Sequence, residues 1–310
     1  MLETKALTKK FKSKTAVESV SLYLNEGESV GLLGPNGAGK STTISMMSTL
    51  LPPTSGEVRF KGVDALKNPQ ELRQVLGVVP QEIALYEELS AYENMKFFGR
   101  IYGLRGKRLE QRIEEVLDMI GLTERKKDRV ETYSGGMKRR INIGVTLLHE
   151  PELLIMDEPT VGIDPQSRNY ILDMIRKLNK EKNMTILYTS HYMEEVEKLC
   201  DRVYIMDHGE IIASGTNQEL KNILANDETI RIDVETLSTD FLDRLEKHAV
   251  VQKVTQEGKG YKVIATRGDD LLGELFDMAK SSNTKIIGVA VQTPTLEDVF
   301  LHLTGRKLRD

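Results

Sequence analysis

The glycine-rich stretch GPNGAGKST, residues 34–42, limits what this chain can fold into more than any other feature. It follows ESVGLLG, which reads as a short buried strand, and it precedes TISMMSTLL, which reads as a helix. Glycines let backbone N–H groups curl around phosphate oxygens without a Cβ clash. The order of strand, glycine loop and helix therefore predicts an α/β core that binds a nucleoside triphosphate.

Each part of this loop has an expected role. The Lys40 ammonium can reach the β- and γ-phosphates, and the Ser41 hydroxyl can ligate Mg²⁺. A glycine turn with an unrelated lysine is the alternative, but a chance match is expected in roughly one chain in a hundred of this length. The predicted nucleotide contacts in the loop are Gly34, Pro35, Asn36, Gly37, Ala38, Gly39, Lys40, Ser41 and Thr42.

Two carboxylates follow a second apolar run. The segment PELLIMDEP, residues 151–159, reads as a buried strand that ends in Asp157 and Glu158. A phosphate loop needs a carboxylate at the end of a second strand to hold Mg²⁺, and Asp157 fits that role. Neighbouring strand residues point to opposite faces, so Glu158 can instead face the attacking water as general base. The alternative is a solvated acidic turn, which the nearby phosphate loop disfavours.

Two more apolar strands end in polar side chains. VLGVVPQ ends in Gln81, and MTILYTSH ends in His191. Ligands of open α/β sheets lie beyond the carboxyl ends of the strands. We therefore expect Gln81 to contact Mg²⁺ or water and His191 to act in catalysis at the γ-phosphate. Either residue alone would more often be structural, but their positions favour the site.

A second candidate phosphate contact is YSGGMKRR, residues 133–140. The chain then reads as a helix, with Ile141, Val145 and Leu148 on one face. Cations are disfavoured at a helix N-terminus because the macrodipole is already positive there. A serine cap, two glycines and three cations at such a place indicate an anion. The residues alone leave open why one chain would carry two phosphate-contacting elements.

Together these motifs resemble the nucleotide-binding subunits of ABC transporters, from residue 2 to about residue 222. They occur in that family's order, as Phe11, residues 34–42, Gln81, YSGGM at 133–137, LLIMDE at 153–158, GID at 162–164 and His191. The resemblance implies a P-loop NTPase fold, with an ABC ATPase domain over 1–222 and an inserted helical subdomain at about 83–150. It also implies that Phe11 stacks on adenine and that Asp164 lies at a dimer interface.

The resemblance offers an answer to the question of two phosphate elements. In this family two subunits stack head to tail, and the serine–glycine helix of one closes over the ATP held by the other. Ser134, Gly135 and Gly136 would then contact the nucleotide of the partner subunit. One chain would contribute half to each of two sites.

Three departures suggest a subfamily. Met137 replaces the commoner glutamine, Phe11 stands where tyrosine is frequent, and Val161-Gly162 stands where Ser-Ala is common. None removes a charge from the phosphate site, so hydrolysis is still expected. The segments DRVETYSGGMKRR and PTLEDVFLHLTGR resemble the ATPases of ABC-2-type drug exporters, the daunorubicin-resistance-like group.

The segment between Gln81 and residue 133 reads as helices, SAYENMKFFGRIYGL and LEQRIEEVLDMIGL. We expect Phe97, Phe98 and Tyr102 in the core of this subdomain. The resemblance implies that the surface around Tyr86 receives a helix from a membrane subunit.

The composition changes near residue 222. From 223 to 310 the order β-α-β-β-α-β suits a small α+β, ferredoxin-like domain. Thr295 and Asp298 then cap a final helix. We see no catalytic residues in this tail and expect it to support dimerisation or folding, with a regulatory ligand pocket as the alternative.

Bulk composition narrows the function further. The net charge of −4 and a pI of about 5.9 do not favour nucleic acid or an anionic membrane as partner. No apolar run approaches the ~20 residues that span a bilayer, and the first residues lack the apolar core of a signal peptide. We expect a cytoplasmic protein, peripheral on the cell membrane through partner subunits only. Cys200 has no partner cysteine and is expected as a small buried residue.

We therefore expect an ATPase with ATP and Mg²⁺ as cofactors, acting as a homodimer or a heterodimer with a paralogue. It would drive export of a drug or other hydrophobic compound through transmembrane permease subunits of an ABC-2-type exporter. The alternative is a soluble ABC ATPase acting on nucleic acid or ribosomes. Repair types carry long coiled coils, which need sustained heptads that this chain lacks, and translation-factor types carry two motif sets. An importer ATPase is a third, weaker alternative.

Overall fold

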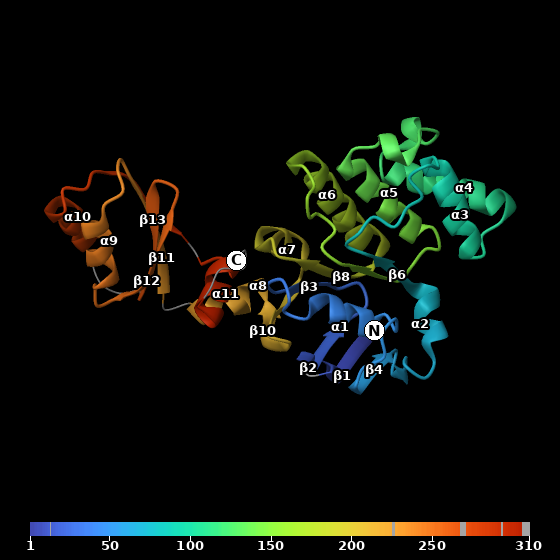
Figure 1. Cartoon of the computed structure of the whole chain (residues 1–310), viewed down its shortest axis with the longest axis horizontal. Helices are drawn as coiled ribbons and strands as arrows, with labels where there is room; N and C mark the ends of the chain where they lie inside the picture. The colour runs from blue at the N-terminus through green and yellow to red at the C-terminus, as the bar shows by residue number, and fades with distance from the viewer. Residues whose placement is uncertain (13, 225–226, 267–270, 293, 306–310) are drawn as a thin grey trace. The chain divides into compact units, whose positions relative to one another are not determined.

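The fold follows from a computed structural model that describes residues 1–12, 14–224, 227–266, 271–292 and 294–305. The described chain falls into two units, one of Met1–Thr216 and one that begins at Asn217 (Figure 1). Each unit has its own cluster of buried apolar side chains, so each is described by itself. The predicted functional division at residue 222 stays a prediction.

The first unit is built around a sheet with the strand order β10-β9-β3-β8-β7-β6. All neighbouring pairs are parallel except β9 and β10. Strands β3, β7 and β8 are buried on both faces, which explains why their sequences are continuous apolar runs. The strands are β3 (Ser29–Leu33), β6 (Leu76–Val79), β7 (Leu153–Met156), β8 (Thr185–Ser190), β9 (Arg202–Asp207) and β10 (Glu210–Thr216).

A second, antiparallel sheet has the strand order β2-β1-β4-β5. Its apolar side chains share one core cluster with helix α1 and with β3 and β7. This shared core holds α1 in place beyond the loop 34–39 that follows β3. The elements are β1 (Leu2–Phe11), β2 (Lys14–Leu24), β4 (Ser55–Phe60), β5 (Val63–Asp64), α1 (Lys40–Met47), α2 (Pro69–Val75), α6 (Pro165–Lys182) and α7 (Met193–Leu199).

A helical part is inserted between β6 and β7, as the sequence predicts (Figure 1). Its first helix begins at Ser90, whose side chain accepts from the Glu93 N–H while the Glu93 carboxylate accepts from the Ser90 N–H. This capping box explains the sharp helix start after the loop. The elements are α3 (Ala91–Ile101), α4 (Gly106–Met119), η1 (Thr123–Arg125), η2 (Val130–Thr132) and α5 (Gly135–Leu147).

The expectation that Phe97, Phe98 and Tyr102 lie in the core is wrong. Phe97 is 40% exposed and Tyr102 41%, while Phe98 is half-buried. Helix α3 carries two apolar stripes, and its buried stripe is Ala91, Met95 and Gly99. The aromatic residues belong to the outer stripe.

The second unit contains one sheet with the order β12-β13-β11-β14, in which every neighbouring pair is antiparallel. Side chains of α9 and α10 form its core with the sheet. The chain order β-α-β-β-α-β confirms the predicted ferredoxin-like arrangement. The elements are α8 (Asn217–Lys221), η3 (Asn222–Leu224), β11 (Asp227–Val234), α9 (Thr239–Glu246), β12 (Val251–Glu257), β13 (Gly260–Thr266), α10 (Leu271–Ser281), β14 (Ile286–Gln292) and α11 (Leu296–Thr304).

The final helix begins as predicted. Thr295 accepts from the Asp298 N–H, and the Asp298 carboxylate accepts from the Thr295 N–H. Asp298 is almost completely buried and pairs with the Lys262 ammonium at 2.7 Å. The acid therefore both caps α11 and ties its first turn to β13.

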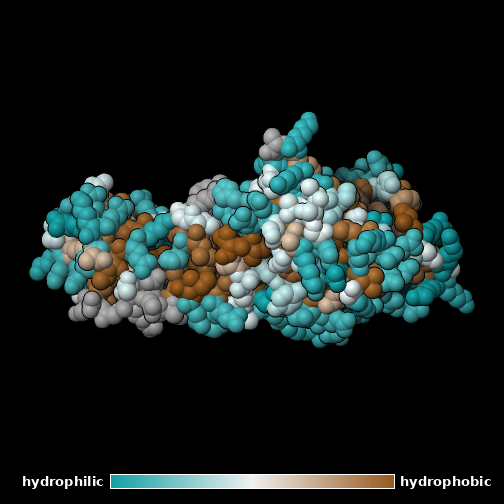
Figure 2. Space-filling model, turned by 90° about the horizontal axis from the view of Figure 1, so that it is seen from below, coloured by the Kyte–Doolittle hydropathy of each residue, from teal (hydrophilic) through white to brown (hydrophobic). Residues whose placement is uncertain are grey.

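Two bulk expectations can be compared with the structure. Cys200 is buried at the end of α7, and burial raises the pKa of its thiol to about 12. No helix in the described part of the chain is long and apolar enough to cross a membrane. Hydrophilic residues cover much of the face shown in Figure 2, and apolar residues reach that surface in patches.

Candidate functional site

The glycine loop borders a cavity of about 420 Å³. Gln81 and Glu158, which the sequence places at the ends of two other strands, line the same cavity. The complete lining is Lys14, Thr15, Ala16, Asn36, Gly37, Gly39, Lys40, Ser41, Thr42, Gln81, Glu158 and His208. The fold thus gathers loop and strand-end residues around one space.

Backbone geometry makes the loop suitable for an anion. Gly39 has a φ of +107° and is the N-cap of α1. A Cβ at this position would lie 2.6 Å from the Ala16 carbonyl oxygen, so only glycine fits without a shift. The first turn of α1 carries no acidic residue. Its free N–H groups and the helix dipole therefore favour a phosphate at this end.

Lys40 is buried at the rim of the loop, with 5% of its side chain exposed. Its ammonium donates to the carbonyl oxygens of Gly34 at 2.8 Å and Pro35 at 3.2 Å. It also lies 3.2 Å from Glu158 Oε1. These three oxygens hold the positive charge beside the cavity.

Glu158 contacts three of the groups predicted from the strand ends and the loop, namely Lys40, Gln81 and His191. Besides Lys40, its Oε2 accepts from Gln81 Nε2 at 3.4 Å and lies 3.5 Å from His191 Nδ1. Its backbone has a φ of +47°, in the left-handed region that non-glycine residues rarely adopt. Such a conformation costs about 1–3 kcal/mol and is typical of functional sites. The carboxylate is therefore held at the junction of Lys40, Gln81 and His191.

Asp157 lies beside Glu158, with 9% of the residue exposed. The Thr189 hydroxyl donates to Asp157 Oδ1 at 2.9 Å and accepts from the Glu158 N–H at 2.9 Å. Thr189 therefore orients both acids. Sequence reasoning missed it, because a threonine within an apolar β8 gives no signal of its own.

The side chains present fit Mg²⁺. A hydroxyl from Ser41, an amide oxygen from Gln81 and a carboxylate from Asp157 are the hard oxygen donors that this ion prefers. Within the described ranges, no group of three or more His, Cys, Asp or Glu residues is placed to hold a metal. Mg²⁺ in nucleotide sites needs no such cage, since substrate phosphates and water complete its shell. The metal assignment stays a prediction.

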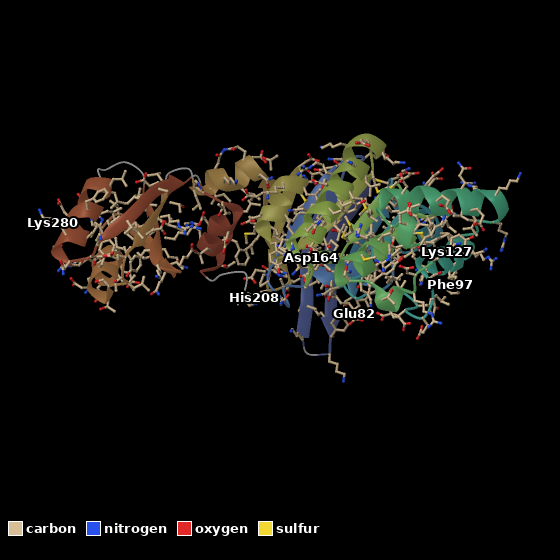
Figure 3. The ribbon with its side chains drawn as sticks, turned by 90° about the horizontal axis from the view of Figure 1, so that it is seen from above. Glu82, Phe97, Lys127, Asp164, His208 and Lys280 are labelled. Carbon is tan, nitrogen blue, oxygen red and sulfur yellow. The ribbon has the colours of Figure 1, made fainter. Side chains whose placement is uncertain are left out.

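The serine–glycine segment lies elsewhere in the chain. Ser134 caps α5 by accepting from the Met137 N–H at 3.3 Å, and Asp164 caps α6 by accepting from the Ser167 N–H at 2.9 Å. A Cβ on Gly136 would lie 2.1 Å from Ser167 Oγ, so the two helix starts pack closely. Ser134, Gly135, Gly136 and Asp164 are all described residues, and none of them lines the cavity. Figure 3 labels Asp164 of this second cluster and His208 of the cavity lining.

The three cations after the glycines do not converge on an anion site, contrary to the sequence pattern. Lys138 pairs with Glu87 at 2.8 Å. The Arg139 guanidinium donates to the carbonyl oxygens of Pro80 and Gln81, at 2.8 and 2.5 Å.

Arg140 donates to the Ile120 carbonyl oxygen at 2.9 Å and stacks 4.7 Å from the Tyr170 ring centre. These side chains anchor α5 to its neighbours. Only the serine and the backbone N–H groups at the start of α5 remain for a phosphate.

Phe11, at the end of β1, is 47% exposed and does not line the cavity. The ammonium of Lys9 lies 5.2 Å from its ring centre. Its partner across the β-hairpin is Lys14, which does line the cavity. Phe11 is therefore exposed next to the site, and its stacking on adenine stays a prediction.

Four lining residues were missed by sequence reasoning: Lys14, Thr15, Ala16 and His208. The first three begin β2, and His208 follows β9. The Gly209 N–H donates to the Ala38 carbonyl oxygen at 2.9 Å, which brings this turn onto the loop. These contacts come from tertiary packing that no local pattern reveals.

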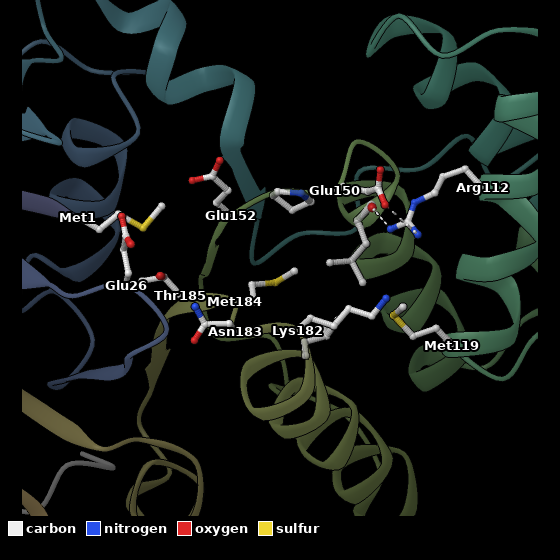
Figure 4. Close-up of a pocket in the computed structure, with 13 residues that line it drawn as sticks. Met1, Glu26, Arg112, Met119, Glu150, Glu152, Lys182, Asn183, Met184 and Thr185 are labelled. Atoms are coloured by element: carbon white, nitrogen blue, oxygen red, sulfur yellow. Dashed lines mark hydrogen bonds and ion pairs between the residues drawn. The ribbon is translucent and has the colours of Figure 1, made fainter.

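A second cavity of about 370 Å³ lies near the starts of β7 and β8 (Figure 4). Methionine side chains make up part of its wall, and the described residues that line it include no glycine. Arg112 donates to the Leu147 carbonyl oxygen at 2.8 Å and lies 3.8 Å from a Glu150 oxygen. Arg112 is therefore already paired, and without a glycine loop beside Lys182 this cavity lacks the backbone cradle of a phosphate site.

Comparisons with known protein families agree with this geometry. Residues 17–161 match the ABC transporter family, and residues 215–304 match the C-terminal domain of ATP-binding proteins similar to DrrA1-3. The linearmycin resistance ATP-binding protein LnrL of Bacillus subtilis is 50% identical, over 100% of both chains. The daunorubicin/doxorubicin resistance ATP-binding protein DrrA of Streptomyces peucetius is 35% identical, over 100% of this chain and 94% of the relative.

Solved structures give the same result for the fold. The ATP-binding subunit of an ABC transporter has a TM-score of 0.65 and 32% identity, over 73% of this chain and 93% of that one. A dimeric ATP-binding cassette in a post-hydrolysis state, bound to ADP and Pi, has a TM-score of 0.64 and 27% identity. That match covers 70% of this chain and 98% of the other. The predicted P-loop NTPase fold is thereby confirmed.

Proposed function

Because the chain belongs to the ABC transporter family of ATP-binding proteins, we propose that it hydrolyses ATP to drive export through separate membrane subunits. The observation that carries this proposal is the meeting of Lys40, Gln81 and Glu158 at one glycine-lined cavity. Two relatives that match over the whole of the chain are drug-resistance ATP-binding proteins. We propose a drug or other hydrophobic compound as the cargo.

The roles of the cavity residues, and of Asp157 and His191 next to Glu158, follow from their chemistry. Backbone N–H groups of the loop and the Lys40 ammonium bind the β- and γ-phosphates. Glu158 accepts the proton of the attacking water, and His191 contacts the γ-phosphate from the end of β8. Mg²⁺, held by Ser41, Gln81 and Asp157, would neutralise charge on the phosphate oxygens.

Two chains complete each site in this proposal. Ser134, Gly135 and Gly136 contact the ATP held by a partner chain, and Asp164 lies at the interface between the two chains. Ser134, Gly135, Gly136 and Asp164 do not line the cavity of their own chain. This supports a composite site, because within one chain the serine–glycine segment and the glycine loop border different spaces. The partner is a second copy or a paralogue. ATP binding closes the dimer, and hydrolysis reopens it.

An exposed aromatic cluster is the proposed contact for the membrane subunits. Tyr86 is 48% exposed and meets Phe97 edge-on, with ring centres 4.9 Å apart. Ile101, one turn after Phe97 in α3, is 64% exposed. Arg139 fixes the Gln81 loop to α5, so motion at this cluster can reach the nucleotide site. We propose permease subunits of the ABC-2 type as the partner, which would hold the chain at the cytoplasmic face of the membrane.

We expect a tagged full-length chain to co-purify with an integral membrane protein from detergent-solubilised membranes of its own host. Phe97→Ala should weaken this association, because it removes a ring from the exposed cluster, while MgATP binding persists. Lys127→Ala is a matched control, since Lys127 is an exposed residue of the same helical part (Figure 3). Recovery of ribosomes or nucleic acid without any membrane protein would instead support the soluble alternative.

We propose an ATPase domain over residues 1–222 and an accessory domain over residues 223–310. The first structural unit ends at Thr216, so a truncated chain is best ended there. We expect it to keep its MgADP affinity within about threefold, less than 1 kcal/mol, because every cavity residue precedes it. Isothermal titration calorimetry with both chains would measure this. A truncated chain that is folded by circular dichroism but binds tenfold more weakly would contradict it.

A further inference from the structure

A buried acid outside the cavity collects an unusual set of donors. Glu195, in the first turn of α7, is 3% exposed. Its Oε2 accepts from three hydroxyl groups, those of Thr160 at 2.7 Å, Tyr188 at 2.7 Å and Ser190 at 3.0 Å. Its Oε1 lies 3.4 Å from Arg168 Nε. The Glu195 carboxylate therefore has four polar partners.

The members of this network come from the segments that carry the site residues. Thr160 follows Glu158 by two positions and begins the loop that leads to Asp164. Ser190 ends β8 and directly precedes His191. Arg168 lies in the first turn of α6, where its N–H donates to the Asp164 carbonyl oxygen at 2.9 Å. The Glu195 carboxylate thus joins three segments: the one that follows Glu158, the one that ends at His191 and the one that begins at Asp164.

We infer that Glu195 is a positioning residue, which holds the loop 159–164 and the end of β8 in a single arrangement. The inference rests on the proposed function, because it concerns the geometry of ATP hydrolysis. Glu195 touches none of the reacting groups itself. It sets where Glu158, His191 and Asp164 lie relative to one another.

The chemistry of the network suits such a role. Hydrogen bonds to a carboxylate are shorter and stronger than those between neutral groups, so Thr160 and the end of β8 are held firmly to α7. Arg168 adds an ion pair from α6. Burial and the nearby Glu195 charge raise the pKa of Tyr188 well above its usual range, which keeps its hydroxyl a donor. A buried charge of this kind seldom stabilises a fold more than apolar packing would. Its advantage lies in fixing one geometry.

The test is Glu195→Gln in the full-length chain, which keeps the side-chain volume but removes the charge that faces Arg168. We expect ATP turnover to fall by on the order of 10²-fold, the effect of misplacing reacting groups by about 1 Å. MgADP affinity should stay within about threefold. Glu194→Gln is the matched control, because it removes the same charge at an exposed position in the same turn. If Glu195 only stabilised the fold, Glu195→Gln would lower the melting temperature, but it would not reduce turnover while leaving MgADP affinity unchanged.

Two further variants each remove one hydrogen bond to Glu195. Thr160→Val releases the loop, and Ser190→Ala releases the end of β8. Each should reduce turnover less than Glu195→Gln does, and neither should reduce it further when combined with Glu195→Gln. If Glu195→Gln does not fold, these two single variants carry the test. Wild-type turnover in both of them would overturn the inference.

The outcomes separate this inference from the function on which it rests. A wild-type chain that binds but never hydrolyses MgATP, alone or with its membrane partner, would overturn the proposed function itself. Normal turnover in the wild type, in Glu194→Gln and in Glu195→Gln would overturn only the role of Glu195.

Discussion

Glu158→Gln is expected to bind MgATP and to hydrolyse it about 10² to 10⁴ times more slowly than the wild type. That loss corresponds to roughly 3 to 5 kcal/mol of transition-state stabilisation. The amide keeps the size of the carboxylate but cannot accept a proton from water. Since closure precedes hydrolysis in the proposed cycle, the variant should accumulate as an ATP-bound dimer.

The geometry explains why binding should survive this change. Glu158 contributes no backbone to the glycine loop, and Lys40 keeps two carbonyl partners without it. Single-turnover hydrolysis would measure the loss of rate, and size-exclusion chromatography with ATP would measure the accumulation of the dimer. Glu82→Gln is a matched control, because Glu82 is an exposed acid next to Gln81 (Figure 3). Near-normal turnover in Glu158→Gln would show that another group is the base.

Local patterns were enough to predict much of the site. The loop 34–42, Gln81 and Glu158 each follow an apolar strand, and parallel strands β3, β7 and β6 end at one edge of the sheet. A strand that ends in a polar residue is visible in sequence, and its neighbours in the sheet follow from the fold class. Gln81, Glu158 and most of the loop therefore line one cavity, whereas Gly34, Pro35, Ala38, Asp157 and His191 do not line it.

The supporting residues could not be predicted in this way. Thr189 and Glu195 act through hydrogen bonds to segments far along the chain, such as Asp157 and Thr160. Nothing within a short window distinguishes them from a strand threonine or a helix glutamate. Packing could not be predicted from a local pattern either. Periodicity finds two apolar stripes in α3 but does not show that the stripe with Phe97 is the exposed one.

For the segment 133–140, one of the reasons for predicting a phosphate contact is wrong. Its three cations read as ligands for an anion, yet each is paired within the chain. Charge density in a sequence does not reveal where long side chains point. The serine cap and the glycines carry the proposed phosphate contact, and they lie away from the cavity of their own chain.

This separation lets an experiment test whether each ATP site is built from two chains. Lys40→Ala removes the phosphate charge from the glycine loop, and Ser134→Arg blocks the start of α5. Loss of the serine cap should cost about 1 kcal/mol, so Ser134→Ala serves as a control for folding. Each disabled variant alone should fail to trap nucleotide, since every site of its homodimer is damaged.

The decisive measurement is trapping of nucleotide in a mixed dimer of Lys40→Ala and Ser134→Arg, purified through two different tags. If the two elements acted within one chain, neither chain would hold a whole site. If they act across the interface, one site carries both lesions and the other pairs an intact Lys40 with an intact Ser134. We expect one nucleotide to be trapped per mixed dimer in the presence of a transition-state analogue of phosphate. A stable mixed dimer that traps none would contradict it.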